Sequence, residues 1–164
     1  MSPPIRVRRI RASEWEIYKT LRLNALRLAP DSFGTTYQDV LSLPDSEWQA
    51  RVHRFSTDPL AINFLASIQE KPLGMVSCFI KDKAEMVQMW VEPVGRGKGL
   101  AQALVEELKS AVRDVGQTQL FASVFESNQS AFLLYRKLGF QEIRREATGL
   151  SGVKATDIHL VCPL

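Results

Sequence analysis

A turn rich in glycine and basic residues is the segment of this sequence best suited to bind a ligand. It contains Gly95, Gly97 and Gly99. Arg96 and Lys98 stand between these glycines and add positive charge. An apolar, strand-like run precedes the turn, and an amphipathic helical pattern follows it. Backbone N–H groups in the first turn of a helix lack internal partners and lie at the positive end of its dipole. Because glycines leave these amides accessible, the turn predicts a phosphate or pyrophosphate site.

Two familiar phosphate-binding motifs do not fit the spacing of this turn. A P-loop needs Ser or Thr after its Gly-Lys pair, but Gly99 follows Lys98. A dinucleotide motif of the Gly-x-Gly-x-x-Gly type needs glycine at position 100 or 102, where Leu100 and Gln102 stand. The remaining alternative is a tight strand-to-helix turn whose basic residues are merely solvated.

A second group of residues shares one face of a helix predicted over residues 128–138. Asn128, Ala131 and Tyr135 fall at helical spacing, so they are expected to line a common groove. The small side chain at position 131 leaves room for a ligand. In the alternative interpretation, Asn128 only caps the helix and Tyr135 is an aromatic residue at the edge of the core.

The elements that position these groups follow from hydrophobic periodicity and turn residues. The patterns predict a strand, two helices, three strands joined by tight turns, a helix, a strand, a helix and two strands. We expect a capping box at residues 13–16 to open the first helix. The predicted elements cover residues 5–10, 13–28, 44–54, 62–68, 73–80, 85–91, 97–115, 120–124, 128–138, 140–145 and 157–161, with a polar stretch at 147–155 before the last strand. A chain of 164 residues without internal repeats favours one domain over residues 1–164.

Composition argues against several classes of partner. The net charge is only +3, and the basic residues near the N-terminus alternate with apolar ones, as on the solvated side of a strand. No stacking aromatics accompany them, so we expect no nucleic-acid partner. Without a long apolar stretch or a signal peptide, we expect a cytoplasmic protein that does not contact a membrane. Cys78 and Cys162 are expected to be buried free thiols, and His53 and His159 have no obvious partner, so we expect no metal site.

The two ligand-binding segments resemble the motifs of the GNAT superfamily of N-acetyltransferases. Residues 96–101 read Arg-Gly-Lys-Gly-Leu-Ala and match its Arg/Gln-x-x-Gly-x-Gly/Ala pattern, after a Val-x-Pro that often closes the fourth strand. Residues 128–140 resemble its Asn-x-x-Ala-x-x-x-Tyr-x-x-x-Gly-Phe pattern. The resemblance extends from Ile5 onward, although residues 12–60 match only in outline. It implies an α/β (α+β) fold with a mixed, mostly antiparallel sheet of six to seven strands flanked by about four helices.

The resemblance also implies acetyl-CoA as cosubstrate. In such enzymes strands four and five splay apart, and the pantetheine arm pairs with the backbone of strand four. The cofactor-binding residues carried over are Met89, Trp90, Val91, Arg96, Gly97, Lys98, Gly99, Leu100, Ala101, Asn128 and Tyr135.

Two proton transfers accompany direct attack of an amine on the thioester. The resemblance places the acid that protonates the leaving thiolate at Tyr135. Glu85 is the first candidate for the base, because histone-type members carry a glutamate at the entrance of strand four. Strand alternation puts it on the face of Val87, Met89 and Val91. An exposed structural charge at Glu85, a base at Glu92, and water chains remain alternatives.

The acceptor expected from the resemblance is a primary amine of a small molecule or amino acid. The alternatives are a protein N-terminus or lysine, or a non-catalytic module that only binds coenzyme A. Segment 21–45 and the terminal strands should build the acceptor site. The candidate residues of this region are Trp15, Asp31, Phe33, Tyr37 and Trp48. A homodimer through the last strand is compatible with such a fold.

Overall fold

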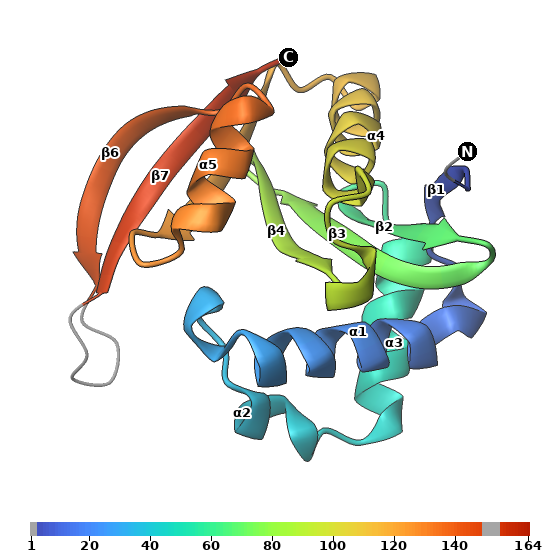
Figure 1. The fold of residues 1–164 in the computed structure, drawn as a ribbon. Coiled ribbons are helices and arrows are strands. Elements are labelled where there is room, and N and C mark those ends of the chain that lie inside the picture. Colours follow the sequence, from blue (N-terminus) through green and yellow to red (C-terminus); the bar gives the residue numbers. More distant parts are fainter. Residues whose placement is uncertain (1–2, 149–154) are drawn as a thin grey trace.

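The computed structural model describes residues 3–148 and 155–164, and a seven-stranded sheet forms its centre (Figure 1). The strand order is β1-β2-β3-β4-β5-β7-β6. Neighbouring strands are antiparallel except β4 and β5, which are parallel. The strands are β1 (Ile5–Arg9), β2 (Ala61–Ile68), β3 (Lys71–Ile80), β4 (Ala84–Val91), β5 (Gln119–Phe125), β6 (Gln141–Thr148) and β7 (Ala155–Pro163).

Helices cover both faces of the sheet. The helices are α1 (Trp15–Leu28), α2 (Tyr37–Leu41), α3 (Asp45–Thr57), α4 (Leu100–Asp114) and α5 (Gln129–Lys137). In Figure 1, α1 and α3 lie below the central strands, whereas α4 and α5 lie above them. No helix among the described residues is long and apolar enough to cross a membrane.

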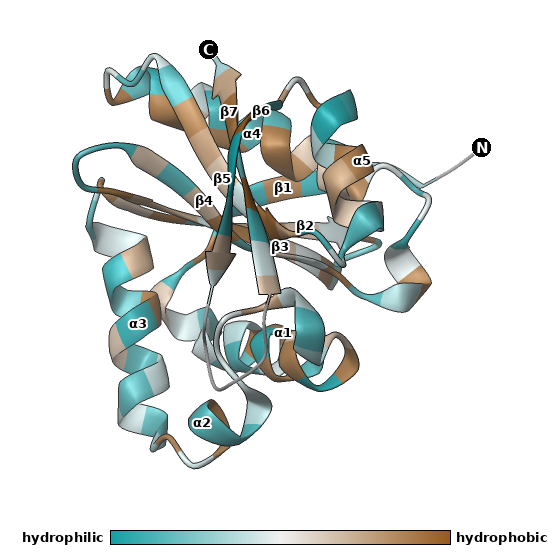
Figure 2. Ribbon diagram, turned by 90° about the vertical axis from the view of Figure 1, so that its left-hand side faces the viewer, coloured by the Kyte–Doolittle hydropathy of each residue, from teal (hydrophilic) through white to brown (hydrophobic). Residues whose placement is uncertain are grey.

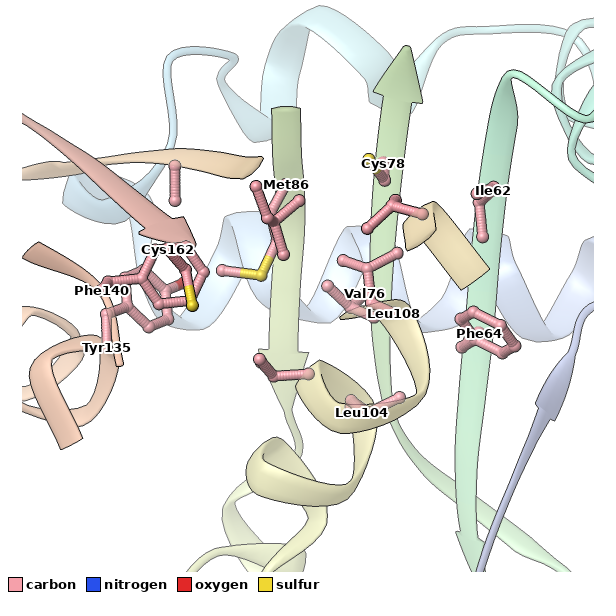
Figure 3. Close-up of a cluster of buried hydrophobic side chains, with 14 of the residues drawn as sticks. Ile62, Phe64, Val76, Cys78, Met86, Leu104, Leu108, Tyr135, Phe140 and Cys162 are labelled. Atoms are coloured by element: carbon pink, nitrogen blue, oxygen red, sulfur yellow. The ribbon is translucent and has the colours of Figure 1, made fainter. Parts of the chain in front are cut away.

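The sheet separates two hydrophobic cores. On one face, α4 packs its apolar stripe against the central strands, and Leu104 and Leu108 lie over Val76 and Phe64 (Figure 3). On the other face, Tyr18 of α1 meets Trp48 of α3 edge to face, with ring centroids 5.9 Å apart. Figure 2 shows that the central strands are mostly apolar, which is why helices cover both faces of the sheet. The side of α3 visible in this view is largely hydrophilic.

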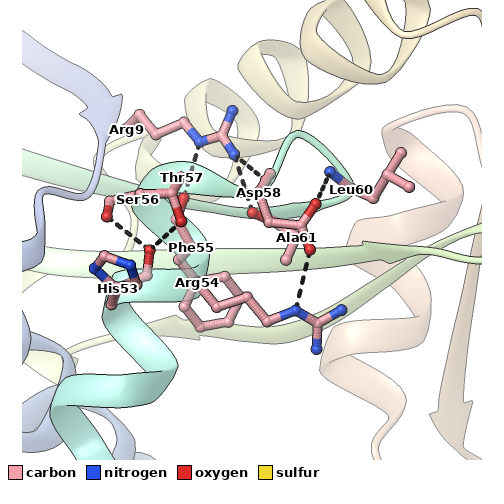
Figure 4. A network of polar contacts seen from close by, with 9 residues as sticks. All are labelled: Arg9, His53, Arg54, Phe55, Ser56, Thr57, Asp58, Leu60 and Ala61. Carbon is pink, nitrogen blue, oxygen red and sulfur yellow. Dashed lines mark hydrogen bonds and ion pairs between the residues drawn. The ribbon is translucent and has the colours of Figure 1, made fainter.

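Basic side chains of β1 hold the first helices to the sheet. The guanidinium of Arg9 donates to the carbonyls of Phe55, Asp58 and Ala61, at 3.1, 2.9 and 3.0 Å (Figure 4). It thereby satisfies the carbonyls of Phe55 and Asp58 at the C-terminal end of α3, which have no partner within the helix, and links them to the first residue of β2. Arg8 forms a bidentate ion pair with the carboxylate of Glu14. Part of the basic run expected to be merely solvated is therefore structural.

The predicted order of elements is confirmed, with three local differences. The short helix α2 lies in a stretch expected to be a loop, and Thr36 caps it by accepting from the Asp39 N–H at 3.2 Å. The capping box expected at residues 13–16 is wrong, because Glu14 instead accepts from the Arg11 N–H at 2.9 Å and α1 begins at Trp15. Strands β6 and β7 extend into the polar stretch expected at 147–155, and residues 149–154 lie outside the described part.

Candidate active site

The only parallel strand pair of the described sheet separates part-way along its length. β4 and β5 pair at just three positions, from Ala84 opposite Leu120 to Met86 opposite Ala122. Beyond Met86, β4 continues to Val91 and β5 to Phe125 without pairing to each other, while β5 stays paired to β7. The separation of these two strands expected from the sequence is confirmed, and it leaves a backbone edge of β4 open to an extended ligand.

A β-bulge in β4 changes which side chains face which core. Gln88 has a positive φ of 55°, and the register with β3 shifts between Met75 and Ser77. Met86 and Met89 therefore both pack on the α4 face. Glu85 pairs with Phe79, which packs on the opposite face. The expectation that Glu85 shares a face with Met89 and Val91 is wrong, because the extra residue reverses the alternation.

A buried polar network supports this bulge. The Gln88 Oε1 atom accepts hydrogen bonds from the Tyr18 hydroxyl at 3.1 Å and from Ser77 Oγ at 2.7 Å. Ser77 Oγ accepts in turn from Asn63 Nδ2 at 2.9 Å. Asn63 and Ser77 are fully buried, so each bond replaces lost hydration. The network compensates the strain of a positive φ at a residue other than glycine.

The glycines of the turn after β4 have different roles. Gly97 and Gly99 adopt left-handed φ values of 75° and 90°, which delays the start of α4 from the expected residue 97 to Leu100. A Cβ atom on Gly97 would meet no heavy atom within 4 Å. A Cβ atom on Gly95 would lie 3.2 Å from the Leu73 Cβ, so Gly95 permits close packing of the turn against β3.

The basic residues of the turn also differ from each other. Arg96 donates from Nε to the carbonyl of Val91 at 3.2 Å, and its guanidinium lies 5.0 Å from the ring centre of Trp90. These contacts fix the end of β4 against the turn. Lys98 is exposed and does not line the cleft between β4 and β5, and its contact with a ligand stays a prediction.

A cleft of about 1120 Å³ runs from this turn along the gap between β4 and β5. Except for Lys98, it is lined by all the residues expected to bind or act on the ligand. They are Glu85, Met89, Trp90, Val91, Arg96, Gly97, Gly99, Leu100, Ala101, Asn128 and Tyr135. The sequence thus located both ends of one continuous cavity.

Tyr135 stands on α5 at the wall of the cleft, 8% exposed, with its ring 5.7 Å from that of Phe140 (Figure 3). Its hydroxyl forms no hydrogen bond to another described residue. Burial raises the pKa of Tyr135 well above its usual range, so the phenol remains protonated near neutral pH. Asn128 caps α5, since its Oδ1 accepts from the Ala131 N–H at 3.3 Å, and its Nδ2 donates to Ser32.

Comparison with known proteins identifies the family. The model of the acetyltransferase (GNAT) family matches residues 22–140, which is most of the chain. The chain belongs to this family. An uncharacterized N-acetyltransferase of Methanocaldococcus jannaschii is 28% identical over 87 residues, covering 48% of this chain and 38% of the relative. The chain therefore matches well under half the length of that relative.

Solved structures show that the chain has the GNAT fold. A GNAT-family acetyltransferase from Streptococcus pneumoniae has a TM-score of 0.83 at 19% identity, covering 98% of this chain and 99% of that one. An acetyltransferase from Salmonella typhimurium, solved with acetyl-CoA, has a TM-score of 0.82 at 16% identity and covers 98% and 94%. The fold inferred from the two sequence motifs is confirmed.

The two candidate bases of this GNAT chain lie in different surroundings. Glu85 lines the cleft next to the last paired residues of β4 and β5, and its Oε1 lies 3.6 Å from Lys83 Nζ. Its carboxylate is about half exposed, with 51% of the side chain accessible. Glu92 does not line the cleft, and it accepts from Asn24 Nδ2 at 2.9 Å. Of the two carboxylates, only Glu85 therefore lies where it can reach a ligand in the cleft.

The sequence did not reveal several polar residues of this GNAT cleft. Ser123 and Asp157 line it from β5 and β7. His159 does not line this cleft and was expected to have no partner, but its Nδ1 lies 3.2 Å from Ser123 Oγ and its Nε2 lies 3.2 Å from Glu146 Oε2. The three side chains come from different strands, and no sequence motif signals that pairing. Arg22 on α1 is a further lining residue that the sequence did not single out.

The remaining expectations concern the acceptor region and the cysteines. Of the candidate acceptor residues, only Phe33 lines the cleft, whereas Trp48 is fully buried in the core. Cys78 and Cys162 are buried free thiols, as expected, and burial raises the pKa of Cys78 to about 12. Within the described ranges, no three His, Cys, Asp or Glu side chains gather as a metal site.

Proposed function

We propose that this chain is an acetyl-CoA-dependent N-acetyltransferase that acts as one domain and acetylates a primary amine of a small molecule or amino acid. The observation that carries the proposal is one cleft joining the glycine turn to the Tyr135 hydroxyl along the unpaired edge of β4. Membership of the GNAT family supports it, as do related folds solved with acetyl-CoA.

The turn before α4 fits the pyrophosphate of the coenzyme. The N–H groups of residues 97–101 surround the start of the helix, where the dipole favours an anion. The space in front of Gly97 is open, and a side chain there would fill it. The pantetheine arm carries amides, so it can pair with the backbone of Met89 and Val91, where β4 has lost its neighbour.

Tyr135 is proposed as the general acid. When bound, acetyl-CoA supplies a thioester whose acetyl group can pass to a neutral amine. A thiolate leaves more readily when a positioned donor protonates it. The Tyr135 phenol is protonated, lines the cleft and has its hydroxyl free of other described residues, so it is available for this bond.

Glu85 is proposed to accept the proton of the amine, directly or through water. An alkyl ammonium has a pKa near 10, so the amine must lose a proton before it attacks. Glu85 lies on the face of β4 opposite Met89 and Val91 and lines the cleft, which supports a role on the side of the amine rather than of the coenzyme arm. Its exposure allows a water molecule to exchange the proton with solvent.

Calorimetric titration with acetyl-CoA, followed by release of free thiol in the presence of an amine panel, tests the proposal. A thiol reagent suits this assay because both cysteines are buried. We expect saturable binding and amine-dependent thiol release. The panel includes peptides with a free N-terminus or a lysine, whose preferential use would indicate a protein acceptor. Binding without release for any amine would indicate a module that only binds the coenzyme.

A further inference from the structure

A buried arginine without a counter-ion stands beside the cleft. Arg22 lies on α1, is only 7% exposed and belongs to the cleft lining. Its Nη1 atom is fully buried and has no hydrogen-bond partner among the described residues. The guanidinium lies over the ring of Phe33, 5.0 Å from its centre. Stacking covers one face of the planar group, so its N–H donors lie in the plane of the guanidinium, at the edge of the cleft that Arg22 lines.

The neighbouring charges do not neutralise Arg22. The groups that act on it are the Tyr18 hydroxyl and the guanidinium of Arg51, and neither is a carboxylate. Arg51 is itself paired with Glu47 at 3.4 Å. In the described part of the chain, Arg22 belongs to no ion pair. Burial lowers the pKa of Arg22, but an arginine side chain remains charged in proteins. A buried charge is costly unless it is paired, so the position requires an anion that the chain does not supply.

Two carboxylates from the strands line the same cleft. Glu85 lines it from β4, and Asp157 lines it from β7. Asp157 forms no ion pair with another described residue, and burial raises its pKa. The cleft therefore offers a cation on the α1 side and carboxylates on the strand side. This separation of charge is complementary to a molecule with an amine at one end and an anion at the other.

We propose that Arg22 binds the carboxylate of the acceptor, so that the substrate class is an amino acid or a similar small molecule with both an amine and a carboxylate. The proposal rests on the acetyltransferase function proposed above and narrows its acceptor. The guanidinium fork matches the two oxygens of a carboxylate, and Phe33 holds the fork in place. The amine end then lies toward Glu85, where its proton is removed.

The test compares amino acids with their carboxamides, which keep the amine and lose the charge. The panel spans α-amino acids, 3-aminopropanoate and 4-aminobutanoate, each paired with its amide. Binding to the protein saturated with coenzyme A is measured by calorimetry, so that the result does not depend on turnover, and thiol release gives KM and kcat in parallel. We expect at least one acid to bind about 10- to 100-fold more tightly than its amide.

Arg22→Met and Arg27→Met form a matched pair on α1. Arg27 is exposed and donates to Asn24 at 3.3 Å, so its loss leaves the cleft intact. We expect Arg22→Met to bind coenzyme A normally but to bind the acid and its amide equally. Arg22→Lys, which keeps the charge but loses the fork, should retain part of the preference. Arg27→Met should retain all of it.

Three results would overturn the inference. They are equal binding of every acid and its amide to the unmodified protein, an unchanged preference in both Arg22 variants, and use of peptides alone. Each leaves acetyl-CoA-dependent acetyl transfer intact, because coenzyme binding and thiol release are measured separately, but use of peptides alone would also overturn the small-molecule acceptor proposed above. If coenzyme A itself does not bind, the proposed function is wrong, whereas selective binding of an acid would still support the role of Arg22.

Discussion

Replacement of Gly97 by leucine should abolish coenzyme binding at little cost to folding. The residue has a φ of 75°, and a side chain in that conformation costs about 1–2 kcal/mol. For a chain of this size, that lowers the melting temperature by about 2–8 °C. The new side chain meets no protein atom near its Cβ, so it extends into the cleft in front of the amides.

The effect on affinity should be much larger than the effect on stability. Hydrogen bonds to a charged group contribute about 1.5–3 kcal/mol each, so loss of two amide contacts to a phosphate amounts to about 3–6 kcal/mol. This corresponds to a loss of affinity of more than about 100-fold. Gly99→Val, at the last residue before α4, should weaken binding in the same way.

Gly116→Leu is the matched control for Gly97→Leu. Gly116 also has a positive φ, 90°, and a Cβ atom there would meet nothing within 4 Å, but the residue follows α4 and does not line the cleft. Both variants should lose similar stability, measured by thermal denaturation, and only Gly97→Leu should lose acetyl-CoA binding, measured by calorimetry. Equal affinities in the two variants would refute a phosphate site at this turn.

Three further substitutions test the acid, the bulge and an ion pair. Tyr135→Phe should lower kcat by about 100-fold or more while the Kd for acetyl-CoA stays the same. An unchanged kcat in thiol-release assays would exclude the phenol as the acid. Ser77→Ala should destabilise the fold by about 1–3 kcal/mol in urea denaturation, because buried Asn63 loses the acceptor of its 2.9 Å hydrogen bond; a change below experimental error would show that the network does not support the bulge. Arg8 lowers the pKa of Glu14, so the stabilisation lost in Glu14→Gln should be full above the ordinary glutamate pKa of about 4.3 and should disappear as the pH falls through the lowered value; a difference that is independent of pH would contradict this pairing.

Local signals in the sequence were sufficient for most elements of the fold. The helical spacing of apolar residues identified α4, and the Asn128 cap identified the start of α5. The glycine turn was recognised because it joins a strand and a helix that are adjacent in the chain. The start of α4 was predicted too early, since the left-handed conformations of Gly97 and Gly99 depend on how the turn packs.

Features that depend on contacts between distant segments could not be read from the sequence. Nothing near Gln88 signals a bulge, because the residue is not glycine and its bonds come from Tyr18 and Ser77. The face of Glu85 was therefore assigned wrongly. Arg22 is one of several arginines in a helical pattern, and only the packing of Phe33 and α1 shows that it is buried without a partner. Sequence periodicity gives the faces of regular elements, but it reveals neither a bulge within a strand nor the charges that lie opposite a side chain.

The decisive measurement is a structure of the protein crystallised with acetyl-CoA. We expect the pyrophosphate to contact the backbone amides between Gly97 and Ala101, the pantetheine arm to pair with β4 beyond Met86, and the Tyr135 hydroxyl to lie within hydrogen-bonding distance of the sulfur. A coenzyme bound outside the gap between β4 and β5, or a sulfur remote from Tyr135, would contradict it.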